Sequence, residues 1–254
     1  MNALTLTVWS LSLGAIAAVA VARVGDLLAR PSVSQLRAVS YHVSVFLLVL
    51  VLSGVLRQLA HPGAGRLQVL QVLAGPLCVG LSNLWIHGWL GAGHRDRLMA
   101  AMLRLSALAL PLLGAAALAL PSELRLPAAA ALSLAGSALT CWLLFRAWII
   151  GDRLALAMAA GCLLTLPAIA GLYAIAMRLA PWGWAADPGI ALCPALSNGL
   201  TGAVLWRRER HQWRTRDPGS VPAVDPLTKV HSSAALVHRM VAAPDRGRDR
   251  FGPR

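Results

Sequence analysis

Three polar side chains in the apolar part of this chain could bind or sense something: Asn83, His87 and Asn198. Asn83 and His87 are four positions apart, so a helix places both on one face. Lipid offers no hydrogen-bond partners, and polar residues in membrane helices therefore face neighbouring helices. We expect these residues either to make interhelical hydrogen bonds or to line a small cavity. In such a cavity a ligand, or the protonation of His87, would be sensed.

Other chemically active residues form no recognisable site. The four cysteines lie in apolar stretches at unrelated spacings, without the C-x-x-C pairs typical of zinc or redox sites. His87 and His94 are separated by two helical turns, roughly 10 Å along the axis, which is too far for one metal ion. The sequence contains no glycine-rich phosphate loop and no acidic cluster. We therefore predict no catalytic residue, no cofactor and no metal site in this chain.

The composition indicates a protein that crosses a membrane several times. Of its 254 residues, 57% are hydrophobic and 13% are charged, and the mean hydropathy is +0.65. Soluble domains average about 25% charged residues. The net charge of +13 comes from arginines between apolar stretches and in the C-terminal part, where orientation signals belong. This distribution argues against nucleic acid as a partner; membrane lipid and a second copy of the chain are the expected ones.

Seven apolar stretches are long enough to span a bilayer, which requires roughly 20 residues per helix. We therefore predict an all-α membrane protein in which residues 1–206 form a seven-helix transmembrane bundle. Pro111 and Pro167 are expected to interrupt the fourth and sixth spans, which membrane helices tolerate. The predicted spans are residues 4–22, 39–60, 67–92, 98–120, 127–150, 154–179 and 188–206.

The arginines between the spans predict the orientation of the bundle. Loops after the first, third, fifth and seventh spans carry more arginines than the loops on the other side. By the positive-inside rule, the N-terminus lies outside and the C-terminus in the cytoplasm. Trp85 and Trp89 are expected at the inner membrane interface. Arg104 and Arg146 are expected to extend from within their spans to the lipid headgroups.

A short segment near the C-terminus resembles a known family. Residues 225–240 read DPLTKVHSSAALVHRM, where Asp225, Leu227 and Thr228 precede apolar residues at helical spacing. This segment resembles the start of a GGDEF domain, the diguanylate cyclase module, which usually reads D-x-L-T-G-L-x-N-R. A turn followed by a peripheral helix is the alternative interpretation. The departures from the family pattern are Lys229, His231, Ser232 and Ser233.

The resemblance implies a sensor in the bacterial inner membrane that precedes a GGDEF output module. Residues 207–224 would then form a cytoplasmic linker, 225–243 the truncated start of the module and 244–254 a disordered tail. The linker is expected to continue the seventh helix as far as about Thr215, before proline and glycine end it. Full-length family members use GTP and magnesium to make cyclic di-GMP. Their G-G-D/E-E-F turn is absent from this sequence, so we expect no cyclase activity from this chain.

Two other classes of membrane protein stay open. A small transporter commonly places Asp or Glu deep in a span and often contains an inverted repeat, and neither is visible here. The membrane part of another sensor, such as a histidine kinase, fits the same bundle. It would require a phosphoacceptor histidine in a cytoplasmic dimerisation helix. His211 is the candidate, but it lacks an extended helical pattern around it.

Overall fold

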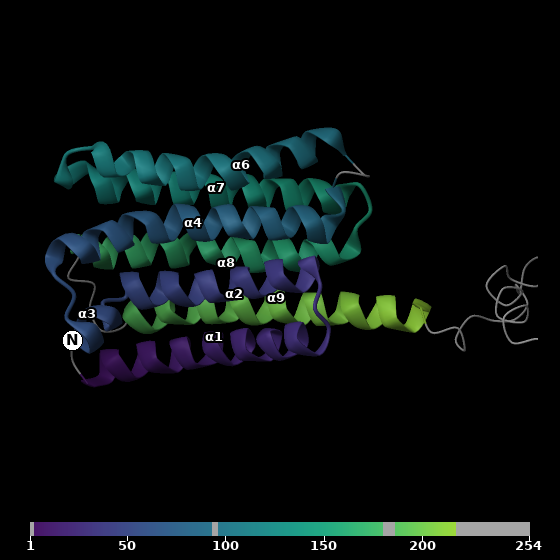
Figure 1. The fold of residues 1–254 in the computed structure, drawn as a ribbon, viewed down its shortest axis with the longest axis horizontal. Helices are drawn as coiled ribbons and strands as arrows, with labels where there is room; N and C mark the ends of the chain where they lie inside the picture. Colours follow the sequence, from purple (N-terminus) through teal and green to yellow (C-terminus); the bar gives the residue numbers. More distant parts are fainter. Residues whose placement is uncertain (1–2, 93–95, 180–185, 217–254) are drawn as a thin grey trace, which may run out of the picture. The chain divides into compact units, whose positions relative to one another are not determined.

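The computed structural model describes residues 3–92, 96–179 and 186–216, and every regular element in them is helical (Figure 1). The all-α prediction is therefore confirmed for this part of the chain. The elements are α1 (Ala3–Ala29), α2 (Val33–Leu52), α3 (Val55–Ala60), α4 (Ala64–Leu90), α6 (Arg97–Ala116), the short 3-10 helix η1 (Ala117–Ala119), α7 (Ser122–Ile149), α8 (Arg153–Ala176) and α9 (Ala186–Arg216).

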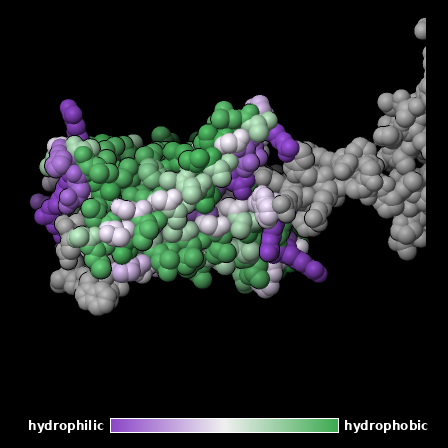
Figure 2. Space-filling model, turned by 90° about the horizontal axis from the view of Figure 1, so that it is seen from below, coloured by the Kyte–Doolittle hydropathy of each residue, from purple (hydrophilic) through white to green (hydrophobic). Residues whose placement is uncertain are grey.

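Seven of the described helices are long and apolar enough to cross a membrane, which confirms the predicted number of spans. Their apolar lengths are 20 to 28 residues, and a bilayer requires roughly 20. Figure 2 shows one face of the molecule, on which a broad hydrophobic surface separates hydrophilic residues gathered toward the ends. These features identify a multi-pass membrane protein.

The observed helices differ from the predicted spans in two respects. The second span was expected to continue to residue 60, but α2 ends at Leu52 and Gly54 takes a left-handed conformation at φ 84°. That conformation costs other residues about 1–2 kcal/mol and glycine almost nothing. The expected interruptions at Pro111 and Pro167 are wrong, since α6 and α8 continue through them. Neighbouring helices in a bundle can satisfy the carbonyl that a proline leaves free.

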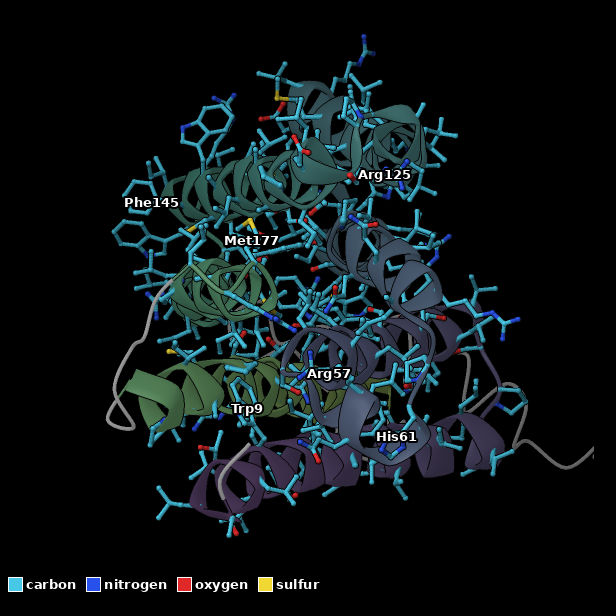
Figure 3. The ribbon with its side chains drawn as sticks, turned by 90° about the vertical axis from the view of Figure 1, so that its left-hand side faces the viewer. Trp9, Arg57, His61, Arg125, Phe145 and Met177 are labelled. Atoms are coloured by element: carbon cyan, nitrogen blue, oxygen red, sulfur yellow. The ribbon has the colours of Figure 1, made fainter. Side chains whose placement is uncertain are left out.

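Side-chain caps determine where three of the helices begin. Ser32, Asp96 and Asp152 each accept a hydrogen bond from a backbone N–H in the first turn of α2, α6 and α8, at 2.9 to 3.2 Å. These bonds satisfy donors that have no partner within a helix. The three capped helices start at the same end of the bundle (Figure 1). Figure 3 views the bundle from the other end, where Arg57 and Arg125 lie.

Two prolines and two glycines bring α4 and α6 into close contact. Pro76 of α4 packs against Gly114 of α6, and Pro111 of α6 packs against Gly80 of α4. A Cβ atom added to Gly80 would lie 2.8 Å from Cδ of Pro111, and one added to Gly114 would lie 2.8 Å from Cβ of Pro76. Small residues at such crossings allow membrane helices to approach closely. The pairing therefore depends on glycine at both positions.

The chain divides into two units, Met1–Val204 and Leu205–Arg254. The first unit is the helix bundle. Of the second unit, the structure describes the last part of α9, which ends at Arg216. The predicted continuation of the seventh helix beyond residue 206 is therefore confirmed. The GGDEF-like segment at residues 225–243 and the tail at 244–254 lie outside the described residues.

Candidate functional site

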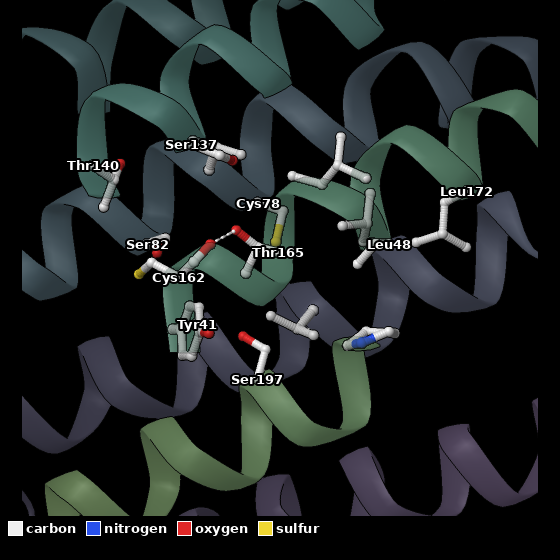
Figure 4. Close-up of a pocket in the computed structure, with 15 residues that line it drawn as sticks. Tyr41, Leu48, Cys78, Ser82, Ser137, Thr140, Cys162, Thr165, Leu172 and Ser197 are labelled. Atoms are coloured by element: carbon white, nitrogen blue, oxygen red, sulfur yellow. Dashed lines mark hydrogen bonds between the residues drawn. The ribbon is translucent and has the colours of Figure 1, made fainter. Parts of the chain in front are cut away.

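A small cavity lies in the bundle, bordered by α2, α4, α7, α8 and α9 (Figure 4). It offers about 50 Å³ to the centres of water-sized molecules, and about 10–15 Å³ is enough for one water. Apolar atoms form most of the surface of its wall, so the surroundings are largely apolar. Six hydroxyl groups also border it, and they belong to Tyr41, Ser82, Ser137, Thr140, Thr165 and Ser197.

The chemistry of the cavity suits a small uncharged molecule. Among the described residues that line it there is no carboxylate, ammonium, guanidinium or imidazole group. Its hydroxyls and the thiols of Cys78 and Cys162 donate and accept hydrogen bonds without carrying charge. Some of this capacity is already used, because Thr165 donates to the carbonyl of Cys162 at 2.6 Å. The lining contains no arrangement of nucleophile and base, so binding is the chemistry that it supports.

Asn83 joins three helices beside this cavity. Its side chain is fully buried and donates to Oγ of Ser106 on α6 at 2.9 Å. Its carbonyl oxygen accepts a hydrogen bond from the hydroxyl of Thr140 on α7. Thr140 in turn borders the cavity. The expectation that Asn83 faces other helices is confirmed, and both ends of its amide have partners.

Asn198 on α9 is paired with a residue that the sequence did not single out. Its Oδ1 lies 2.6 Å from Nδ1 of His42 on α2, and both side chains are fully buried. Because a carbonyl oxygen accepts, Nδ1 of His42 carries the proton and Nε2 is left as an acceptor. Neither Nε2 of His42 nor Nδ2 of Asn198 has a hydrogen-bond partner among the described residues. The pair thus presents one unused acceptor and one unused donor in an apolar interior.

His87 takes part in a third, separate contact. Its Nε2 accepts a hydrogen bond from Nε of Arg104 on α6 at 3.0 Å, and its side chain is half-buried. The structure therefore places Asn83, His87 and Asn198 in three different hydrogen-bonded contacts. Other residues line the cavity. A sensing role for these three residues stays a prediction.

Two tryptophans near the α4–α6 connection are more buried than expected, and an arginine there forms an ion pair. Trp85 and Trp89 are only 2% and 6% exposed, so their rings pack inside the bundle and do not face lipid. Trp85 instead stacks on Tyr41, with ring centroids 4.9 Å apart and planes at 8°. Arg146 makes an ion pair with Asp96 at 2.8 Å. The hydrogen bond from Arg146 holds the pKa of the Asp96 carboxyl below its ordinary value of 3.8.

Part of this site had a signal in the sequence, and part had none. Thr140 shares a face of α7 with other small and hydroxyl-bearing residues, a pattern that indicates contact with other helices. His42 had no such signal, because its partner Asn198 is far away along the chain and the spacing of residues within α2 says nothing about α9. Tyr41 likewise meets its ring partner only through the packing of α2 on α4.

Three comparisons with known proteins identified no relative of this chain. A scan against protein-family models, a search of curated proteins and a search of solved structures found no match. What the chain does has therefore to be inferred from its residues and their geometry.

Proposed function

We propose that this chain is the transmembrane sensor part of a GGDEF-type bacterial signalling protein. In this proposal the N-terminus lies outside, the C-terminus lies in the cytoplasm, and α9 leads to the output segment that starts at Asp225. Two features of the sequence support it: the resemblance of residues 225–240 to a GGDEF domain start, and the arginine-rich loops on one side of the bundle. The chain lacks the G-G-D/E-E-F turn, so cyclic di-GMP would require an intact output domain.

The continuity of α9 is the observation that carries the proposal. The helix continues without interruption from Ala186 to Arg216, shortly before Asp225. Within the bundle, polar contacts join it to α1, α2 and α8, so a change in the bundle would alter its position. A single helix that is held by polar contacts within the bundle and ends nine positions before Asp225 is a suitable transmitter. The contacts are Ser12–Ala191, Arg23–Gly202, His42–Asn198 and Ser197–Gly161.

The His42–Asn198 pair and the cavity beside it supply a place for a stimulus to act. Ser197, which borders the cavity, is next to Asn198 on α9. A water, a small uncharged ligand or a proton that used the free Nε2 of His42 would change the contact between α2 and α9. Unpaired polar groups in an apolar interior are costly, so satisfying them yields free energy for a conformational shift.

A chimera tests this function. An active GGDEF domain is fused after Val224, and cyclic di-GMP is measured in cells that carry the chimera or its catalytically inactive version. We expect His42→Gln and Asn198→Leu each to change the cyclic di-GMP level at least about fivefold, the lower range of ordinary coupling between sites. Gly199→Ala is the matched control, because Gly199 is exposed and an added Cβ meets nothing within 4 Å.

Equal cyclic di-GMP levels in all variants would contradict the proposal, provided that each chimera reaches the membrane in the same amount. Such a result would favour a transporter or the membrane part of another sensor class. Uptake of small neutral solutes into vesicles containing the purified chain would then separate these alternatives, because a sensor should catalyse none.

A further inference from the structure

Three nitrogen-bearing side chains from three helices meet at the end of the bundle where α2 and α6 begin. Nε of Arg104 on α6 donates to Nε2 of His87 on α4 at 3.0 Å. The guanidinium of Arg37 on α2 lies over the neighbouring residue Gly88, since a Cβ added there would be 2.8 Å from Nη1 of Arg37. Gly88 thus leaves room for Arg37 beside His87. We call Arg37, His87 and Arg104 the basic cluster.

The basic cluster carries positive charge that no acidic side chain in the described residues neutralises. Two ion pairs in the described residues are those of Arg23 with Asp26 and of Arg146 with Asp96. Asp96, the acidic cap of α6, is therefore already engaged by Arg146. Neither arginine of the basic cluster is among the residues that make these pairs.

The hydrogen bonds within the basic cluster leave its donors available. An arginine Nε–H can only donate, so Nε2 of His87 accepts and the imidazole is neutral with its proton on Nδ1. Arg104 uses Nε for this contact, and its terminal NH2 groups make no hydrogen bond or ion pair with the described residues. His87 therefore fixes the direction of the Arg104 guanidinium. A planar guanidinium with free N–H groups binds phosphate oxygens in pairs.

The residues of the basic cluster lie near the ends of their helices, at a depth that matches the headgroup region of a bilayer. Arg37 and His87 lie within about 6 Å of the ends of α2 and α4, and Arg104 lies about 10 Å from the start of α6, at 1.5 Å per residue. Phosphates of lipids occupy the zone between the hydrocarbon core, about 30 Å thick, and the outer limit of the bilayer at about 40–45 Å. Long arginine side chains can reach that zone from one or two turns inside.

We propose that Arg37, His87 and Arg104 form a binding site for the phosphate group of an anionic phospholipid. The two guanidinium groups hold the phosphodiester oxygens, and His87 is the positioning residue that orients Arg104. Because no acidic side chain among the described residues neutralises its arginines, the site favours a lipid with net negative charge over a zwitterionic one. This inference does not depend on the sensor function proposed above.

Native mass spectrometry of the purified full chain in detergent tests the site. Phosphatidylglycerol, an anionic lipid, and phosphatidylcholine, a zwitterionic one, are titrated separately and the bound lipids are counted. We expect phosphatidylglycerol to bind the native chain more tightly. Arg37→Gln and Arg104→Gln should each weaken its binding about tenfold, which corresponds to about 1.4 kcal/mol. Arg66→Gln, at the other end of α4 and exposed, is the control and should change the affinity less than twofold.

Gly88→Ala keeps every charge and tests the geometry. Its added Cβ would meet the far end of the flexible Arg37 side chain, which can move away without disturbing the helices. We expect weaker phosphatidylglycerol binding with an unchanged elution profile in size-exclusion chromatography. Native affinity in both arginine variants and in Gly88→Ala would overturn the proposal. Displacement of the lipid by inorganic phosphate at comparable concentration would also overturn it, because the site would then recognise free phosphate.

Discussion

The two sides of the bundle differ in how completely their buried polar groups are paired. On the α4–α6–α7 side, Asn83 has partners on both ends of its amide. On the α2–α9 side, the contact between His42 and Asn198 leaves one acceptor and one donor without partners. A satisfied network stabilises one arrangement of helices, whereas an incompletely satisfied one can be changed by a small ligand, a water or a proton. The α4–α6–α7 side is therefore suited to hold the helices in one arrangement, which we call the support side. The α2–α9 side is suited to change its arrangement when a ligand, water or proton binds.

The largest expected effect comes from disrupting the support side. Gly80→Leu would place a side chain against Pro111 and the carbonyl of Ala107, 2.8 and 3.0 Å from the new Cβ. Overpacking of this kind costs about 1–3 kcal/mol or more. We expect a large drop in the temperature at which the detergent-solubilised chain loses its monodisperse elution peak. Gly199→Leu, in open space, should change that temperature little. Equal effects would show that the α4–α6 crossing is not tightly packed.

A smaller effect distinguishes the polar contacts of the two sides. Asn83→Leu removes two interhelical hydrogen bonds, each contributing about 0.6 kcal/mol on average and at most about 1.7 kcal/mol. It should therefore destabilise the bundle. The double variant His42→Leu with Asn198→Leu removes a pair that is only half satisfied, and replacing both partners by apolar groups can be nearly neutral. We expect its thermal stability to stay close to that of the native chain. If the double variant lost more thermal stability than Asn83→Leu, the His42–Asn198 contact and not the Asn83 network would be the more stabilising one.

The smallest expected effect concerns the pH dependence of the ion pair that joins the start of α6 to α7. The pKa of Asp96 is lowered by the hydrogen bond from Arg146, so the folded state favours the ionised carboxylate. The stabilisation is present above the ordinary pKa of 3.8 and is lost as the pH falls through the lower folded pKa. We expect the native chain to be more stable than Asp96→Asn at pH 7. This difference should vanish once the pH falls below the pKa of Asp96 in the folded state. A difference independent of pH would show that capping of α6, and not charge, accounts for the role of Asp96.

Much of the fold could be predicted from the sequence, because each helix is defined by local chemistry. A run of apolar residues long enough to cross a bilayer has to satisfy its backbone internally, and a helix does so within one segment. The number of spans follows from this. The continuation of the seventh helix past its apolar part was predicted because no proline or glycine occurs between Trp206 and Asp217. The break after α2 was missed because Gly54 in an apolar stretch is compatible with a helix until its neighbours favour the left-handed conformation.

The candidate site was predictable only in part. The sequence indicated that Asn83 and Asn198 face other helices, since a polar amide in lipid has to find a partner. It could not pair Asn198 with His42, or Arg104 with His87, because these partners belong to different helices. Nor could it place Trp85 inside the bundle against Tyr41, where an interfacial position was expected. Residue types alone do not specify which faces of two helices meet.

The sequence by itself determined that this chain is a set of apolar helices with a basic, polar C-terminal part, because hydropathy and charge act residue by residue. The tertiary structure decided which polar groups are satisfied and which are not. In the folded bundle the amide of Asn83 has hydrogen-bond partners at both ends, whereas His42 Nε2 and Asn198 Nδ2 have none among the described residues. Packing also brings Arg104 to His87 and Arg37 to the neighbouring Gly88. Those outcomes depend on the distances between helices that are remote in the chain, and only packing sets these distances.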